Sequence, residues 1–276
     1  MNNLFNSETG NTVMIPMDHG LMLGVQPGLE DPVQSLKNFA SLQPDAILMN
    51  FGILKLTRDY LSELDDRPGI ILEVDFNETW EDWKKPIDRE GIIGHCKITD
   101  MENAAKYGAD AVKVLFPLGL DPETQLDHMR HTAEIVNEAE RYEMPVMLEP
   151  VTMGSYISEE RKNDPAIIAD GSRIALELGA DILKAPYLGE EHHEEFRALC
   201  QNSHVPVVML GGPKRGGVKG ILETAERGVE AGARGPIFGR NVWQRPEEEM
   251  RKVVKSLQDI VHEGAETEEV MKKYAL

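Results

Sequence analysis

Cysteine is nearly absent from this sequence, which has only Cys96 and Cys200 among its 276 residues. Two cysteines cannot build a disulfide framework, and their wide separation does not match the paired spacing of a zinc site. The dinucleotide-binding pattern Gly-x-Gly-x-x-Gly is also missing after the first expected strand. We therefore expect a protein of the reducing cytoplasm, without a cysteine zinc site and without a dinucleotide-binding fold.

Positive charge and long apolar runs are scarce as well. Lys and Arg number 29 against 48 Asp and Glu, so the formal net charge is −19, which disfavours nucleic acids and anionic membrane surfaces as partners. No apolar run approaches the roughly 20 residues that span a bilayer. Residues 1–8 lack the basic and apolar regions of a signal peptide. We expect neither a nucleic-acid partner nor a membrane partner.

Short apolar runs instead alternate with amphipathic helical segments, which is the pattern of a parallel α/β fold. The first strand is expected at 12–17 and the eighth at 236–239. The strands between them are expected at 46–50, 69–75, 111–116, 145–149, 181–183 and 205–210. Asp31 and Thr99 stand where helix N-caps are expected. Eight strand–helix pairs predict a single (β/α)8 TIM-barrel domain, with a helical tail at 263–276.

The pattern lapses between residues 76 and 97, a polar stretch that contains Trp80 and Trp83. A loop of this length after a strand is more often functional than idle. We expect a loop that either reaches over the pocket or remains an ordinary surface connection.

One sequence motif recurs, and two of its copies end on a lysine. Gly179-Ala-Asp-Ile-Leu-Lys184 and Gly108-Ala-Asp-Ala-Val-Lys113 share their spacing, and the frame returns at 232–237. Equal spacing in a barrel places Lys113 and Lys184 in one inward layer at the carboxyl ends of the strands. The active sites of TIM barrels lie at these ends. Crowded ammonium groups among apolar neighbours lower each other's pKa, so one amine would be neutral and able to attack a carbonyl. Alternatively, each lysine merely ends a strand and extends to solvent.

Other polar residues follow the same strand ends. Glu149 closes the fifth strand, where it would relay protons beside the lysines or form only a structural ion pair. Asp18 and His19 end the first strand and would bind a substrate hydroxyl or hold Lys184, although His19 could be purely structural. The adjacent His192 and His193 lie in an acidic helix, so we expect solvated side chains, with a fortuitous metal site as the alternative.

Glycine-rich loops follow the seventh and eighth strands, at 211–217 and 239–243. Backbone N–H groups of such loops suit a phosphate, as does a following helix N-terminus, and TIM barrels often bind phosphate at these two loops. An arginine adds a charge-assisted contact. Ordinary turn glycines are the alternative. The expected phosphate contacts are Gly211, Gly212, Gly239 and Arg240.

The assembled motifs resemble those of class I aldolases of the DeoC/FbaB/LacD superfamily, and most of all the archaeal-type (DhnA-type) fructose-bisphosphate aldolases. The resemblance covers nearly the whole chain and rests on Met17-Asp-His-Gly20, 172–181 with Lys184, 208–214 and 239–245. It implies a TIM barrel with Lys184 as the Schiff-base lysine, Asp18 at the active site and phosphate held by the two glycine loops. It also implies a homo-oligomer, a large ring-type assembly in that family.

One position departs from that branch, which carries a tyrosine acid where this sequence has Val151. Leu148-Glu-Pro150 is instead similar to tagatose-bisphosphate aldolases, in which the glutamate is an acid/base and a strand-4 lysine, here Lys113, lies in the pocket. We expect a class I aldolase acting on a phosphorylated ketose or related sugar phosphate. It should need no metal and no other cofactor, because the iminium does the polarising that a zinc ion would otherwise do. A thiolase acting on a phosphorylated diketone and a non-catalytic sugar-phosphate-binding protein are the alternatives. The expected catalytic residues are Lys184, Glu149, Lys113 and Asp18, with His19 as a substrate contact.

Overall fold

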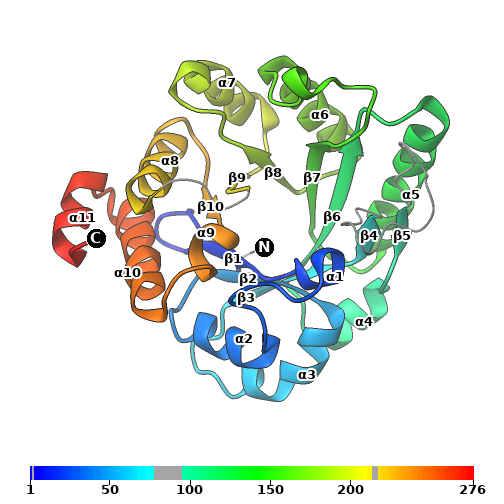
Figure 1. Ribbon diagram of the computed structural model, residues 1–276. Helices are drawn as coiled ribbons and strands as arrows, with labels where there is room; N and C mark the ends of the chain where they lie inside the picture. The colour runs from blue at the N-terminus through cyan, green and yellow to red at the C-terminus, as the bar shows by residue number, and fades with distance from the viewer. Residues whose placement is uncertain (2, 78–94, 213–216) are drawn as a thin grey trace.

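Eight parallel strands close into a barrel in the order β1-β10-β9-β8-β7-β6-β3-β2, which confirms the predicted TIM barrel (Figure 1). The computed structural model describes residues 1, 3–77, 95–212 and 217–276. The barrel strands are β1 (Met14–Pro16), β2 (Ala46–Asn50), β3 (Gly69–Glu73), β6 (Ala111–Leu118), β7 (Val146–Thr152), β8 (Ile182–Pro186), β9 (Val207–Leu210) and β10 (Gly235–Ile237).

Helices surround the barrel, each turning an apolar stripe toward the outer face of the strands (Figure 1). They are α2 (Pro32–Ala40), α3 (Phe51–Ser62), α4 (Met101–Lys106), α5 (Pro122–Arg141), α6 (Pro165–Glu177), α7 (His193–Ser203), α8 (Val218–Glu230) and α10 (Glu247–Gln258). The short helices are α1 (Gly20–Leu23) and α9 (Arg240–Trp243), and α11 (Thr267–Tyr274) forms the predicted helical tail. Single turns occupy Glu159–Arg161, Glu190–His192 and Asp259–Glu263. None of the described helices is long and apolar enough to cross a bilayer.

The helix starts follow capping chemistry. The Asp31 carboxylate accepts the backbone N–H groups of Val33 and Gln34 at the start of α2, as predicted. The predicted Thr99 cap is wrong. α4 begins two residues later, and Asp100 caps it by accepting the N–H of Asn103 at 2.8 Å.

The interior of the barrel is apolar at its amino-terminal end. Its buried members are Leu4, Met14, Ala46, Leu48, Ile71, Ala111, Met147, Ile182, Val208 and Ile237. Leu4 comes from the segment before β1, and its carbonyl accepts a hydrogen bond from Thr12 Oγ1 at 2.7 Å. The N-terminal segment therefore fills the amino-terminal end of the barrel. Among the described residues, the buried charged side chains of the interior lie toward the carboxyl ends of the strands.

The repeated Gly-Ala motif also has a structural role. Its glycines all take the left-handed conformation favoured by glycine: Gly108 at φ +77°, Gly179 at +105° and Gly232 at +108°. The following aspartates bind the neighbouring strand, because Asp110 accepts the N–H of Ile70 and Asp181 that of Val146, both at 2.8 Å. The motif thus fixes the height of each strand against its neighbour.

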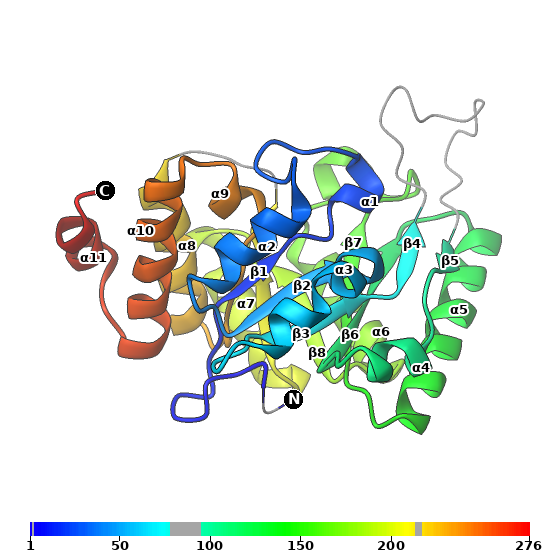
Figure 2. The same cartoon turned by 90° about the horizontal axis from the view of Figure 1, so that it is seen from below.

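Among the predicted strand ends that differ from the structure, two concern the site. β7 continues to Thr152 and β8 to Pro186, so Glu149 and Lys184 lie within strands instead of closing them. The ends of the expected 76–97 loop pair as antiparallel strands, β4 (Asp75–Asn77) and β5 (His95–Lys97), beside α5 (Figure 2). Residues 78–94, on which its predicted position over the pocket depends, lie outside the described residues.

Candidate active site

Lys113 of β6 and Lys184 of β8 meet at one carboxylate oxygen inside the barrel. Glu149 Oε2 of β7 lies 2.9 Å from the Nζ of Lys113 and 2.9 Å from the Nζ of Lys184. The two lysine side chains are 1% and 7% exposed. The predicted inward layer is therefore present, and the alternative in which these lysines extend to solvent is wrong.

Glu73, at the end of β3, is a second carboxylate that the sequence reasoning missed. Its Oε1 and Oε2 lie 3.1 and 3.0 Å from Lys113 Nζ, and its backbone is paired in register with Lys113. The available signal was alternation along the strand: Ile71 faces the barrel interior, so the residue two positions later faces it too.

These carboxylates decide the charge of Lys113. Burial would lower the pKa of Lys113, but Glu149 and Glu73 together raise it well above its usual value. Burial would likewise raise the pKa of Glu149, yet Lys113 and Lys184 hold it below its usual value. The expectation that crowding lowers the lysine pKa therefore fails for Lys113, because carboxylates outnumber amines around it. Lys113 is a charged lysine bridging two acids.

Replacing Lys113 by Met should lower the free energy of unfolding by about 3–5 kcal/mol at pH 7, since it leaves buried acids without their partner. Because the folded pKa of Lys113 is raised, its stabilisation is fully present below the ordinary lysine pKa and is lost as pH rises through the folded value. Urea unfolding of both proteins at neutral and strongly alkaline pH measures this difference. Lys97→Met, which breaks an exposed pair with Glu138, is the control and should cost less than about 1 kcal/mol. Equal losses in the two variants would contradict a central role for Lys113 in stability.

Asp18 follows β1 at the same end of the barrel and is buried. Its Oδ1 lies 3.1 Å from His19 Nδ1, and the imidazole ring meets the ring of Trp243 edge-on at 5.4 Å. Burial would raise the pKa of Asp18, but His19, Lys184 and Lys113 outweigh it and lower the pKa. Asp18 is therefore an anion that both lysines stabilise. His19 lies between Asp18 and the ring of Trp243.

The four expected phosphate contacts lie after the neighbouring strands β9 and β10. Asn241 Nδ2 donates to the carbonyl of Gly211 at 2.8 Å, which ties the two loops together. Gly212 has a positive φ of +60°. A Cβ on Gly239 would lie 3.1 Å from His19 Cε1, so that loop packs closely on His19. Arg240 begins α9 next to it; residues 213–216 of the first loop lie outside the described residues.

The histidines of the acidic segment behave differently from one another. His193 is half-buried, with Nδ1 3.1 Å from the Tyr187 hydroxyl and Nε2 2.9 Å from Arg197 Nη2, so its predicted solvation is wrong. His192 stays partly exposed, 3.8 Å from Glu195. No group of three or more His, Cys, Asp or Glu side chains in the described residues is arranged to hold a metal ion.

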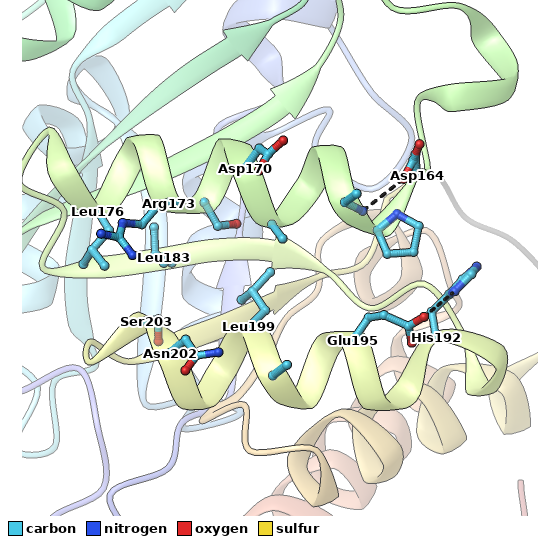
Figure 3. Close-up of a pocket in the computed structure, with 15 residues that line it drawn as sticks. Asp164, Asp170, Arg173, Leu176, Leu183, His192, Glu195, Leu199, Asn202 and Ser203 are labelled. Atoms are coloured by element: carbon cyan, nitrogen blue, oxygen red, sulfur yellow. Dashed lines mark hydrogen bonds and ion pairs between the residues drawn. The ribbon is translucent and has the colours of Figure 1, made fainter.

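A cavity of about 620 Å³ lies outside the barrel, between α6 and α7 (Figure 3). Leu183 lines this cavity, whereas the next residue along β8, Lys184, contacts Glu149 inside the barrel. Strand alternation thus separates the two spaces, and none of the candidate site residues lines the outer cavity.

Comparison with known proteins identifies the family of this chain. The model of the DeoC/LacD family aldolases matches residues 12–245. An uncharacterised aldolase of Saccharolobus solfataricus is 30% identical over 96% of this chain and 94% of its own length. The 2-amino-3,7-dideoxy-D-threo-hept-6-ulosonate synthase of Halobacterium salinarum is 27% identical over 95% and 91%. A solved archaeal fructose-1,6-bisphosphate aldolase, with its catalytic lysine covalently bound to a carbinolamine intermediate, superposes with a TM-score of 0.78 at 26% identity, covering 94% of this chain and 96% of that one. This chain therefore belongs to the DeoC/LacD family of aldolases and is a class I aldolase.

Proposed function

We propose that this aldolase makes or breaks a carbon–carbon bond in a phosphorylated ketose through a Schiff base on Lys184. The observation that carries the proposal is the single Glu149 oxygen 2.9 Å from both lysine amines. An amine that attacks a carbonyl must first lose a proton, and a carboxylate in hydrogen-bond contact can take it. The carbinolamine on the catalytic lysine of the solved relative supports the same chemistry.

Glu149 acts first as a base and then as an acid when the imine forms. Its carboxylate takes a proton from the Lys184 ammonium, and the free amine attacks the ketone carbon. Proton transfers through the Glu149 carboxyl neutralise the oxygen and the nitrogen of the adduct to give the carbinolamine. A further proton from Glu149 leaves with that hydroxyl as water, and a protonated imine remains. Lys113 stays charged throughout and keeps Glu149 ionised and oriented between turnovers.

Cleavage then uses the protonated imine as an electron sink. Glu149 removes the proton from the hydroxyl on the far carbon of the bond to be broken, two carbons from the imine carbon. That oxygen becomes the aldehyde carbonyl, and the bond electrons move into the imine to leave an enamine. Protonation of the enamine and addition of water restore Lys184 and release the ketone product. Asp18, buried and ionised beside His19, is suited to accept a hydrogen bond from a substrate hydroxyl.

A panel of phosphorylated ketoses tests this function, with product release followed by mass spectrometry. We expect at least one ketose phosphate to yield an aldehyde and a phosphorylated ketone. Acyl transfer from a phosphorylated diketone without ketose cleavage would instead indicate the thiolase. Binding of sugar phosphates with neither reaction would indicate a non-catalytic sensor.

Arg240→Ala should weaken binding of the phosphorylated substrate roughly 10- to 150-fold, since hydrogen bonds to charged groups contribute about 1.5–3 kcal/mol. The proposal rests on the position of Arg240 next to Gly239, which lies close to His19. KM for the phosphorylated and unphosphorylated forms of one substrate is the measurement. Equal losses for both forms would mean that Arg240 supports the barrel and does not bind phosphate.

We also propose a cytoplasmic homo-oligomer. Both cysteines are free thiols, which suits a reducing compartment, and burial raises the pKa of Cys200 to about 12, which makes its thiol unreactive. The oligomer rests on the family resemblance alone. Light scattering on the purified protein measures its mass, and a monomer at micromolar concentration would contradict an oligomer.

A further inference from the structure

A buried arginine holds the short helix that follows β10. Arg245 lies between α9 and α10, and its side chain is 5% exposed. Its Nε donates to the carbonyl of Asn241 at 2.6 Å, and its Nη1 lies 2.5 Å from Oε1 of Glu249 on α10. None of the steps proposed for Lys184 involves Arg245, although burying a guanidinium is costly.

Asn241 links Arg245 to the loop after β9. A helix leaves its last carbonyl groups without backbone partners, and the guanidinium bonds one of the last carbonyls of α9, that of Asn241. Through its side chain the same residue donates to the Gly211 carbonyl at 2.8 Å. A Cβ on Gly211 would lie 3.0 Å from that amide nitrogen, so the loop approaches Asn241 closely. Asn241 is thus held by Arg245 at its backbone and holds the β9 loop with its side chain.

Other contacts fasten α9 to β1 and not to the β9 loop. Trp243 Nε1 donates to the Pro16 carbonyl at 3.0 Å, and the Trp243 ring meets His19 edge-on. A Cβ on Gly239 would lie 3.1 Å from both the Pro16 carbonyl oxygen and His19 Cε1. These contacts do not involve Arg245, so they should survive its replacement. Loss of Arg245 should therefore loosen the β9 loop relative to α9 and leave His19 in place.

We propose that Arg245 is a positioning residue that sets the spacing between the two phosphate loops by acting through Asn241. The inference rests on the proposed function, in which the loops that begin at Gly211 and Gly239 bind the substrate phosphate. Backbone N–H groups bind a phosphate well only when they converge on it, so the spacing of the loops decides their affinity. Attack of Lys184 on a ketone does not depend on that spacing. Arg245 should act on the affinity for a phosphorylated ligand and not on the Schiff base itself.

Dihydroxyacetone phosphate and dihydroxyacetone are the probes, since they differ only in the phosphate. The concentration of each that gives half-maximal borohydride trapping measures its affinity, and trapping at saturation reports the Schiff base. In Arg245→Met we expect the half-maximal concentration of dihydroxyacetone phosphate to rise about tenfold, the lower end of the range for losing a hydrogen bond to a charged group. The value for dihydroxyacetone should be unchanged, as should trapping of either probe at saturation.

Arg251 offers a matched control on the same helix. It pairs with Glu247 at 2.9 Å and with i,i+4 spacing, as Arg245 does with Glu249, but its side chain is 42% exposed. Arg251→Met should therefore leave both half-maximal concentrations unchanged. A rise for dihydroxyacetone phosphate in this variant as large as that in Arg245→Met would overturn a specific role for Arg245.

A double variant tests whether Arg245 acts through Asn241. Asn241→Ala removes the amide that bonds Gly211, so it should weaken binding of dihydroxyacetone phosphate by itself. Adding Arg245→Met to Asn241→Ala should then cause no further loss, because the effects of residues that share one link are not additive. Losses that multiply in the double variant would overturn the route through Asn241.

Arg245→Lys covers the case in which Arg245→Met does not fold. Lysine keeps a positive charge beside Glu249, but its single amine lacks the planar fork with which the guanidinium bonds Glu249 and Asn241 together. We expect the same selective loss for dihydroxyacetone phosphate. Normal affinity for this probe in either folded variant, or equal losses for both probes, would overturn the inference and leave the aldolase mechanism intact. Absence of trapping in wild type with both probes would overturn the proposed function and the inference with it.

Discussion

Lys184→Ala should abolish turnover, with kcat lowered by about 10⁴-fold or more, in the range found when a catalytic nucleophile is removed. The physical reason is that the imine supplies the electron sink for the bond cleavage. Lys184 pairs with Glu149 at 2.9 Å, whereas Lys113, the other amine at Glu149, is also held by Glu73. Steady-state cleavage of the best ketose phosphate is the measurement.

Lys113→Ala is the informative comparison, because Lys113 shares the same carboxylate oxygen but is held by a second acid. It should retain a Schiff base on Lys184 while losing stability and part of its rate. Turnover that survives in Lys184→Ala and disappears in Lys113→Ala would transfer the covalent role to Lys113.

Glu149→Gln should slow cleavage by roughly 10²–10⁴-fold, the usual contribution of a positioned acid/base. Glutamine keeps the size of the side chain but cannot take a proton from Lys184 or from the substrate hydroxyl. The Schiff base should still form, more slowly, because the amine of Lys184 remains. Single-turnover cleavage at the pH optimum of the variant is the decisive quantity.

If Glu149 has only a structural role, its replacement should give a different result. Its removal would lower stability and shift the pH profile while the rate at the optimum survived. A single-turnover rate within about threefold of wild type, far short of the acid/base range, would refute the proton transfer. Val151→Tyr is a less decisive additional test, because a tyrosine at that position of β7 must also adopt the orientation of the family's tyrosine acid.

The positions of the two lysines could be predicted because they depend on short stretches of consecutive residues. The repeated Gly-Ala-Asp frame ends at Lys113 and Lys184, and the structure shows the physical reason: each glycine turn and aspartate fixes the height of the next strand. The barrel followed from the alternation of strands and helices for a similar reason, since each signal is short-range.

The rest depends on contacts between distant segments. Glu73 reads as the end of an apolar strand, and only the register with β6 places it against Lys113. His95 lies at the end of a stretch without periodicity, and its contact with Asp75 exists because β4 and β5 pair across 17 residues that lie between them. The helix cap at Asp100 instead of Thr99 reflects the usual uncertainty of element boundaries by one or two residues.

The most direct test of the Schiff base is borohydride trapping with dihydroxyacetone phosphate, followed by intact-mass analysis and peptide mapping. We expect wild type to gain one covalent adduct, located on the peptide that contains Lys184, and Lys184→Ala to gain none. An adduct that persists in Lys184→Ala and maps to Lys113, or no adduct on wild type with any ketose phosphate that it cleaves, would contradict Lys184 as the Schiff-base lysine.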